Sequence, residues 1–149
     1  MTKQPTPSRK TLLSQAVIKA IKALCPVIVS GNGKGGVGKS TWAFHMAAAA
    51  VEMGIKTLII DMDEHLTITE TGSSHPELPE YAFSCDLFTE EGITKPIMEL
   101  AALPGCWFLP RDSRLDEVNS TPFESGIVLL PHSHMDSLRE DFDLIILDT

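Results

Sequence analysis

Residues 27–41 read VIVSGNGKGGVGKST, and the architecture of the chain can be worked out from them. A short, mainly β-branched run, 27–30, predicts a buried strand; a glycine-rich segment and then a helix-forming segment follow it. From Gly33 to Ser40 the sequence matches G-x-x-x-x-G-K-[ST] at every fixed position. This pattern is typical of a loop whose backbone N–H groups surround phosphate oxygens. The alternative, a glycine-rich turn with an exposed lysine, does not account for the strand-like and helix-like flanks.

Two residues of the motif carry most of its chemistry. Lys39 is expected to reach the β- and γ-phosphates of a nucleotide, and Ser40 to offer its hydroxyl to Mg²⁺. The helix predicted over 39–53 begins at the motif, so its positive dipole end adds to the anion site.

Two further apolar runs, 56–60 and 144–147, lack alternation and predict buried strands of a parallel sheet. Acids follow both runs: Asp61 and Asp63 come after the first, and Asp148 ends the second. A strand-end aspartate is the usual second magnesium ligand of such loops, whereas the alternative for all three is an ordinary solvated turn acid.

The order of strands and helices predicts an α/β fold with a doubly wound, mainly parallel sheet. Right-handed crossovers would bring Gly33, Asp63 and Asp148 to one sheet edge. The remaining predictions are a helix over 10–24, a strand over 106–109, the end of a helix at 136–141, and two short helices within 81–102 broken at Gly92.

Composition restricts the class of protein. With 149 residues, 43% hydrophobic and 21% charged, the chain fits one globular domain. No run of 18 apolar residues predicts a membrane-spanning helix. The three cysteines are widely spaced, which favours buried free thiols and a cytoplasmic protein.

Charge divides the chain into a basic arm, 1–24, and an acidic remainder, 25–149. The arm holds five of the twelve basic residues and no acid, so it carries +5, and the remainder carries −13. The amphipathic helix of the arm could bind DNA, an anionic membrane or a partner protein. It could equally pack on its own domain or on a dimer mate.

The motif also resembles a known family. KGGVGKST at 34–41 is similar to the deviant Walker A signature of the ParA/MinD ATPases, which belong with the nitrogenase iron protein and the arsenite-pump ATPase. The resemblance continues over residues 25–149. TLIIDMD at 57–63 looks like the strand and switch I segment, GCWFLPRDSRLDEV at 105–118 like the third strand and its helix, and DFDLIILDT at 141–149 like the Walker B strand.

The resemblance implies roles residue by residue. The implied catalytic residues are Lys34, which in the family reaches the nucleotide of a dimer partner, Lys39, and Asp63, which orients the attacking water. The implied nucleotide-binding residues are Gly33, Lys34, Gly35, Gly36, Val37, Gly38, Lys39, Ser40 and Thr41. The implied Mg²⁺ site comprises Ser40, Asp61 and Asp148, so that the cofactors are ATP and Mg²⁺.

The chain departs from the family at two places. Partition ATPases often continue switch I as Asp-Pro-Gln, whereas Glu64 and His65 follow Asp63 here. The family also continues after Walker B with a second switch and the segments that hold adenine and bind DNA, whereas this sequence stops at Thr149. We therefore expect a P-loop domain truncated after the Walker B strand, with an open edge at strand 27–30 and little ATP turnover on its own.

The function expected is that of an ATP-binding and ATP-hydrolysing ParA-like ATPase in plasmid or chromosome partition, working by ATP-dependent dimerisation. Its expected partners are a second copy on ATP binding, a ParB-like activator and, for the complete protein, nonspecific DNA. Its expected location is cytoplasmic or nucleoid-associated, because no stable membrane anchor is seen. The alternative is a non-enzymatic truncated module that pairs with and regulates a full-length ATPase of this type.

Overall fold

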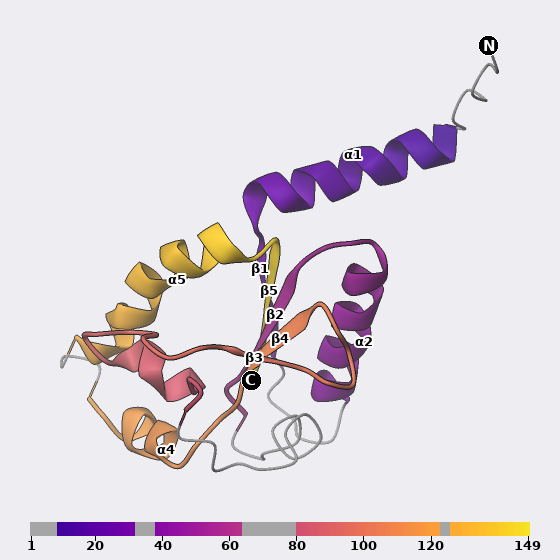
Figure 1. Ribbon diagram of the computed structural model, residues 1–149. Coiled ribbons are helices and arrows are strands. Elements are labelled where there is room, and N and C mark those ends of the chain that lie inside the picture. Colours follow the sequence, from indigo (N-terminus) through magenta and orange to yellow (C-terminus); the bar gives the residue numbers. More distant parts are fainter. Residues whose placement is uncertain (1–8, 32–37, 64–79, 123–125) are drawn as a thin grey trace.

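The computed structural model describes residues 9–31, 38–63, 80–122 and 126–149 (Figure 1). The helices are α1 (Arg9–Leu24), α2 (Lys39–Glu52), η1 (Ser84–Phe88), α4 (Arg114–Asn119), η3 (Ile127–Leu129) and α5 (Leu130–Asp141), of which η1 and η3 are 3₁₀ helices. The strands are β1 (Val27–Ser30), β2 (Thr57–Asp61), β3 (Met98–Glu99), β4 (Cys106–Leu109) and β5 (Leu144–Asp148).

The strands form a single sheet in the order β1-β5-β2-β4-β3. The first four are parallel to one another, and β3 runs antiparallel to β4 at one edge. Figure 1 shows α2 on one face of the sheet and α5 with α4 on the other. The predicted doubly wound, mainly parallel α/β fold is therefore confirmed.

Alternate strand residues supply two cores, one on each face. On the α2 face, Ile59 and Ile146 pack against small helix residues such as Ala47. The alanines let the helix axis approach the sheet closely, and Gly54 ends this helix in the left-handed conformation (φ 71°) that glycine adopts without strain. On the α5 face, Leu58 and Ile145 pack against Leu138.

Strand β1 lies at an edge of the sheet in the part of the chain that the structure describes. Its register pairs Val27 with Ile145 and Ser30 with Asp148, and no described strand pairs with its other side. The Val29 residue is accordingly 59% exposed. The expectation of an open edge at this strand is confirmed for the described residues.

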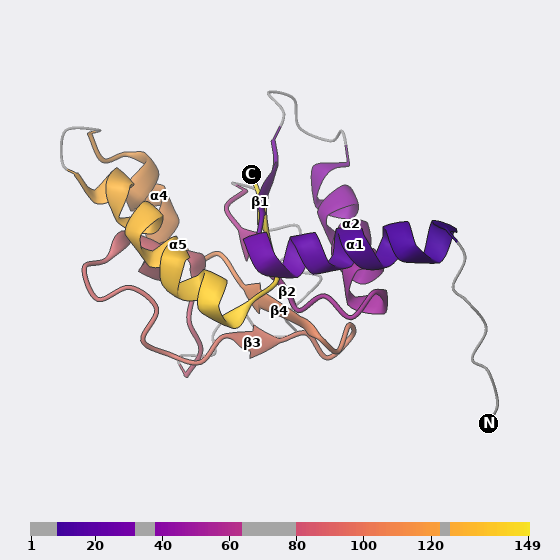
Figure 2. The same cartoon turned by 90° about the horizontal axis from the view of Figure 1, so that it is seen from above.

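Helix α1 extends beyond the rest of the described molecule (Figures 1 and 2). Ile18 and Ile21 pack against the α2-side core, whereas Val17 and Leu24 are exposed. Lys22 Nζ lies 3.4 Å from Asp143 Oδ2 and ties the end of the helix to the turn before β5. The packing alternative for this helix thus holds for one of its faces. Each helix in the described part of the chain is too short or too polar to span a lipid bilayer.

The prediction of two short helices within 81–102 is wrong in its second half. The structure has η1 before Gly92, but an irregular segment and the short strand β3 after it. The ring of His134 lies so close to Gly92 that a Cβ there would meet it at 2.6 Å, and this contact holds the segment against α5. Tertiary packing and pairing with β4 therefore override the local helical pattern.

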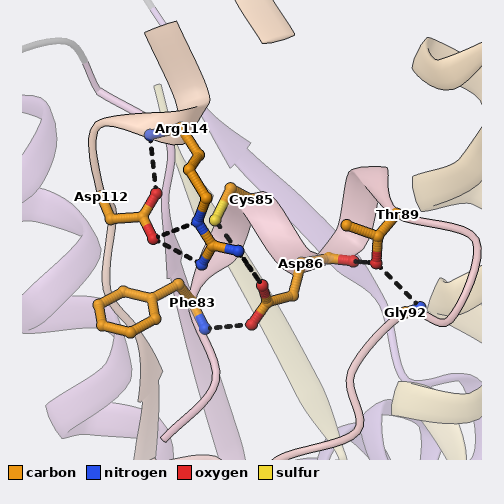
Figure 3. Close-up of polar contacts among 7 residues, drawn as sticks. All are labelled: Phe83, Cys85, Asp86, Thr89, Gly92, Asp112 and Arg114. Carbon is orange, nitrogen blue, oxygen red and sulfur yellow. Dashed lines mark hydrogen bonds and ion pairs between the residues drawn. The ribbon is translucent and has the colours of Figure 1, made fainter. Parts of the chain in front are cut away.

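A polar cluster around Arg114 joins η1 to α4 (Figure 3). The Arg114 guanidinium makes an ion pair with Asp86 at 2.9 Å and donates from Nε to Asp112 Oδ2 at 2.8 Å. Asp86 also accepts a hydrogen bond from the Phe83 N–H, and the Cys85 thiol lies beside the two carboxylates. We call these residues the Arg114 cluster. The cluster holds Arg114, the first residue of α4, against Asp86 of η1.

Candidate functional site

Three neighbouring strands end level with one another at one edge of the sheet. The register places Ser30 of β1 opposite Asp148 of β5, and Asp148 opposite Asp61 of β2. The Met62 N–H then donates to the Asp148 carbonyl at 2.7 Å and continues the alignment beyond β2. The sequence prediction that strand-end acids gather at one edge is met for the acids of β2 and β5.

Helix α2 begins at this edge and presents Lys39. Gly38 precedes it in the left-handed conformation (φ 83°), which turns the chain into the helix. The Lys39 ammonium lies 3.8 Å from Asp63 Oδ2, and both side chains are largely shielded, at 13% and 15% exposed. Residues 24 positions apart in sequence thus place a cation and a carboxylate face to face, where a phosphate and an attacking water would have to be oriented.

Asp61 and Asp63 are joined through the backbone. The Asp63 N–H donates to Asp61 Oδ1 at 3.2 Å, and the Asp61 residue is fully buried. This hydrogen bond fixes the direction in which the chain leaves β2, and hence the position of Asp63 opposite Lys39.

Asp148 is the most unusual acid of the site. It is fully buried, and neither carboxylate oxygen has a hydrogen-bond partner among the described residues. Burial raises the pKa of its carboxyl, and the charges of Asp61 and Asp63 raise it further, against the opposing effects of the Ser40 hydroxyl and of Lys39. The Ser40 hydroxyl is thus close to Asp148, without meeting hydrogen-bond geometry with either oxygen.

The donor set of this edge fits a magnesium ion. Mg²⁺ prefers carboxylate, hydroxyl and water oxygens, and it keeps several waters. A buried carboxylate with unfilled lone pairs, beside the Ser40 hydroxyl and the Asp61 carboxylate, supplies ligands of that kind. Of the residues predicted as metal ligands, the structure therefore brings Ser40, Asp61 and Asp148 to one place.

Several predicted site residues lie outside the described part of the chain. They are Gly33, Lys34, Gly35, Gly36 and Val37 of the loop, together with Glu64 and His65 after switch I. The roles assigned to them stay predictions. Thr41 is described, and it lies exposed in the first turn of α2.

Ser30 and Thr149 also lie at this edge, although the sequence analysis gave neither of them a role. The Ser30 hydroxyl donates to the Lys39 carbonyl at 3.1 Å, and the Ser30 carbonyl accepts from both the N–H and the hydroxyl of Thr149. One signal could have identified Ser30: a single polar residue closes the apolar strand VIVS directly before the loop.

Known proteins resemble this chain in sequence and in fold. The model of the AAA domain family matches residues 25–149. The septum site-determining protein MinD of Synechocystis sp. is 29% identical over 124 residues, which cover 82% of this chain and 44% of MinD. The resemblance to ParA/MinD-type P-loop ATPases is thereby confirmed.

Solved structures share the fold. Cobyrinic acid a,c-diamide synthase from Mycobacterium smegmatis, with a bound ATP analogue and magnesium, has a TM-score of 0.68 and 24% identity, over 84% of this chain and 51% of that one. A plasmid partition protein from Borrelia burgdorferi has a TM-score of 0.65 and 24% identity, over 83% of this chain and 54% of that one. The chain spans about half the length of the proteins it matches.

Proposed function

The chain belongs to the AAA domain family, and from this premise we propose that it is a ParA-like ATPase that binds and hydrolyses ATP with Mg²⁺. The observation that carries the proposal is the pairing of Lys39 with Asp63 beside the buried, unpartnered carboxylate of Asp148. A cation, a water-orienting acid and a metal-binding acid are the three groups that phosphoryl transfer to water requires.

Each residue has a defined task in this reaction. Lys39 would hold the β- and γ-phosphate oxygens, with the loop glycines and Thr41 around the remaining oxygens. Ser40 and Asp148, with Asp61 behind them, would hold Mg²⁺, whose charge offsets the negative charge that develops on the phosphates. Asp63 would accept a hydrogen bond from the attacking water and direct it in line with the γ-phosphate.

Dimerisation completes the proposed site. Lys34 would enter the nucleotide site of a second copy, so that hydrolysis depends on ATP-bound dimers. The cycle would serve plasmid or chromosome partition, with a ParB-like activator and nonspecific DNA as further partners, in the cytoplasm or on the nucleoid. The plasmid partition protein among the structural neighbours supports this choice of process.

A second candidate function rests on strand β1. Its outer side has no partner strand among the described residues, and Val29 is exposed there. A non-enzymatic module could offer this edge to a full-length ATPase of the same family and regulate it. Co-purification with such an ATPase from the source cells would support this function, and recovery of the chain alone or with itself would contradict it.

Nucleotide titration tests the main proposal. We expect the wild-type chain to bind a fluorescent ATP analogue in the presence of Mg²⁺, and Lys39→Ala to weaken binding at least about tenfold, as expected for loss of a charge-assisted contact to phosphate. Lys56→Ala is the matched control, because Lys56 lies at the opposite end of β2, over the rings of Trp107 and Phe142. Equal affinities of the wild type and Lys39→Ala would overturn the proposal.

A further inference from the structure

Ser30 lies between the start of α2, which carries Lys39 and Ser40, and the end of β5, which carries Asp148. It is the last residue of β1, is only 7% exposed, and is followed by the loop that leads to α2. Its hydroxyl donates to the carbonyl of Lys39, the first residue of α2, at 3.1 Å. The bond therefore joins the end of the strand directly to the start of the helix, across the eight residues between them.

The backbone of Ser30 makes a second connection. Its carbonyl accepts from the Thr149 N–H at 3.1 Å and from the Thr149 hydroxyl at 3.3 Å. Thr149 directly follows Asp148, whose register partner is Ser30 itself. The approach is close, because a Cβ added to Gly31 would lie 3.1 Å from the Thr149 hydroxyl oxygen. The strand that carries Asp148 is thus held against the same residue that holds the start of α2.

The structure assigns to Ser30 the role of a positioning residue for the Mg²⁺–nucleotide complex. By bonding to Lys39 on one side and to Thr149 on the other, it sets the spacing between the Ser40 hydroxyl and the Asp148 carboxylate. Those two groups come from different elements, and a Mg²⁺ ion bound here would need both of them within its reach at the same time. Ser30 itself touches no phosphate and no metal in this arrangement, and the assignment rests on the proposed ATPase function.

The chemistry of the position agrees with this role. A hydroxyl buried at the end of an apolar strand is costly unless it is hydrogen-bonded, so an apolar residue would be the default at this place. An apolar residue has no donor for the Lys39 carbonyl. The start of α2 would then lose its hydrogen bond to the end of β1, and only apolar packing would remain between the two elements.

Calorimetric titration of the full chain with ATP, in Mg²⁺ and separately in EDTA, tests the role. We expect Ser30→Ala to weaken binding about three- to tenfold in Mg²⁺, the size of one lost hydrogen bond, and clearly less in EDTA. Ser30→Thr keeps the hydroxyl and should restore the Mg²⁺-dependent affinity to within about twofold. Thr149→Val removes the other hydroxyl and should act in the same direction as Ser30→Ala.

Thr57→Val is the matched control. The Thr57 hydroxyl is also buried and also donates to a backbone carbonyl, that of Ile55 at 3.0 Å, but at the opposite end of β2. This variant should lower the melting temperature without changing affinity for ATP. If Ser30→Ala behaves like Thr57→Val, or weakens binding equally with and without Mg²⁺, the positioning role is overturned. A wild-type chain that binds no ATP would overturn the proposed function itself, and the two failures are thereby distinguished.

Discussion

At the scale of single residues, Asp148 is a carboxylic acid that folding removes from water. Burial raises its folded pKa above the ordinary value, so the fold disfavours the ionised carboxylate relative to the unfolded chain. The contribution of this group to stability is therefore fully present below its unfolded pKa and is lost as pH rises through the folded pKa. At neutral pH the ionised carboxylate destabilises the chain, a cost that suits a residue placed for binding a cation.

Asp148→Asn removes this cost. We expect the variant to unfold at a higher temperature than the wild type at pH 7, by about 2–4 °C for a gain on the order of 1 kcal/mol. The difference should narrow as pH is lowered toward 4, because the wild-type carboxyl then takes up its proton. Thermal unfolding followed by circular dichroism without Mg²⁺ at several pH values measures this. A lower melting temperature of the variant at pH 7 would contradict the argument.

The three cysteines provide a second residue-scale prediction. Cys25, Cys85 and Cys106 are free and buried, and burial raises the pKa of the Cys106 thiol to about 12. Only the thiolate reacts readily with a disulfide reagent, so all three should react slowly in the native chain at pH 8. All three should react within minutes in denaturant. Rapid release of the chromophore of Ellman's reagent by the native chain would show that at least one thiol is accessible.

The acids of the site could be predicted from the sequence, but its hydrogen bonds could not. Asp61 and Asp148 stand out because each closes an apolar run, and Asp63 follows two residues after Asp61; parallel strands bring such ends together. The bonds of Ser30 join it to Lys39 and Thr149, which lie 9 and 119 positions away. The register of β1 against β5 places Thr149 within reach of Ser30, and no local pattern encodes a register.

At the scale of elements, the Arg114 cluster holds η1 and α4 together by charge. Burial works against the ionised form of Asp112, but the hydrogen bonds from Arg114 and Cys85 outweigh it, and the pKa of Asp112 lies below its ordinary value. The stabilisation is therefore present above the unfolded pKa and is lost as pH falls through the lower, folded one. Half of the Arg114 side chain is exposed, so screening keeps the effect small.

Asp112→Asn tests the cluster. We expect it to destabilise the chain by up to about 1 kcal/mol at pH 7. The difference from the wild type should shrink below about pH 4, where the wild-type carboxyl also loses its charge. Urea unfolding at a series of pH values measures it, with Asp136→Asn as the control, since Asp136 pairs with Arg139 on the outer surface of α5. A difference that stays constant down to pH 3 would mean that the charge of Asp112 contributes nothing.

The elements differ in how far the sequence predicts them. The strands β2, β4 and β5 could be found because they are buried on both faces and therefore contain unbroken apolar runs. Strand β3 has only two residues and forms by pairing with the edge of β4, so it is too short to show an alternating hydrophobic pattern in the sequence. The irregular segment after Gly92 lies against His134 of α5, which is more than 40 residues away in the sequence, so the local sequence around Gly92 could not predict it.

At the scale of the whole molecule, α1 is attached to the body through one face only. Ile18 and Ile21 pack against the α2-side core, whereas Val17 is 57% exposed and Leu24 is 73% exposed. Ile18→Ala with Ile21→Ala should therefore lower stability by about 1–3 kcal/mol, since both residues are only partly buried. Val17→Ala with Leu24→Ala should change it by less than about 0.5 kcal/mol.

Chemical denaturation of the two double variants makes the comparison, because both replace two branched residues of the same helix with alanine. A larger loss of stability from the Val17 and Leu24 variant would mean that the exposed face of α1 is covered in solution. Equal and negligible losses from both pairs would mean that α1 folds independently of the body.

At the same scale, we expect the edge at β1 to promote association between molecules. Val29 is exposed on a strand whose outer hydrogen-bonding groups have no partner among the described residues, and such an edge is a template for pairing with a second chain. Val29→Lys should lower concentration-dependent light scattering, since a charge on an edge strand opposes edge-to-edge pairing. Leu129→Lys makes the same change of charge on an exposed apolar residue of η3, away from the sheet edge. If both variants reduce scattering equally, net charge alone governs association and the edge of β1 has no special part in it.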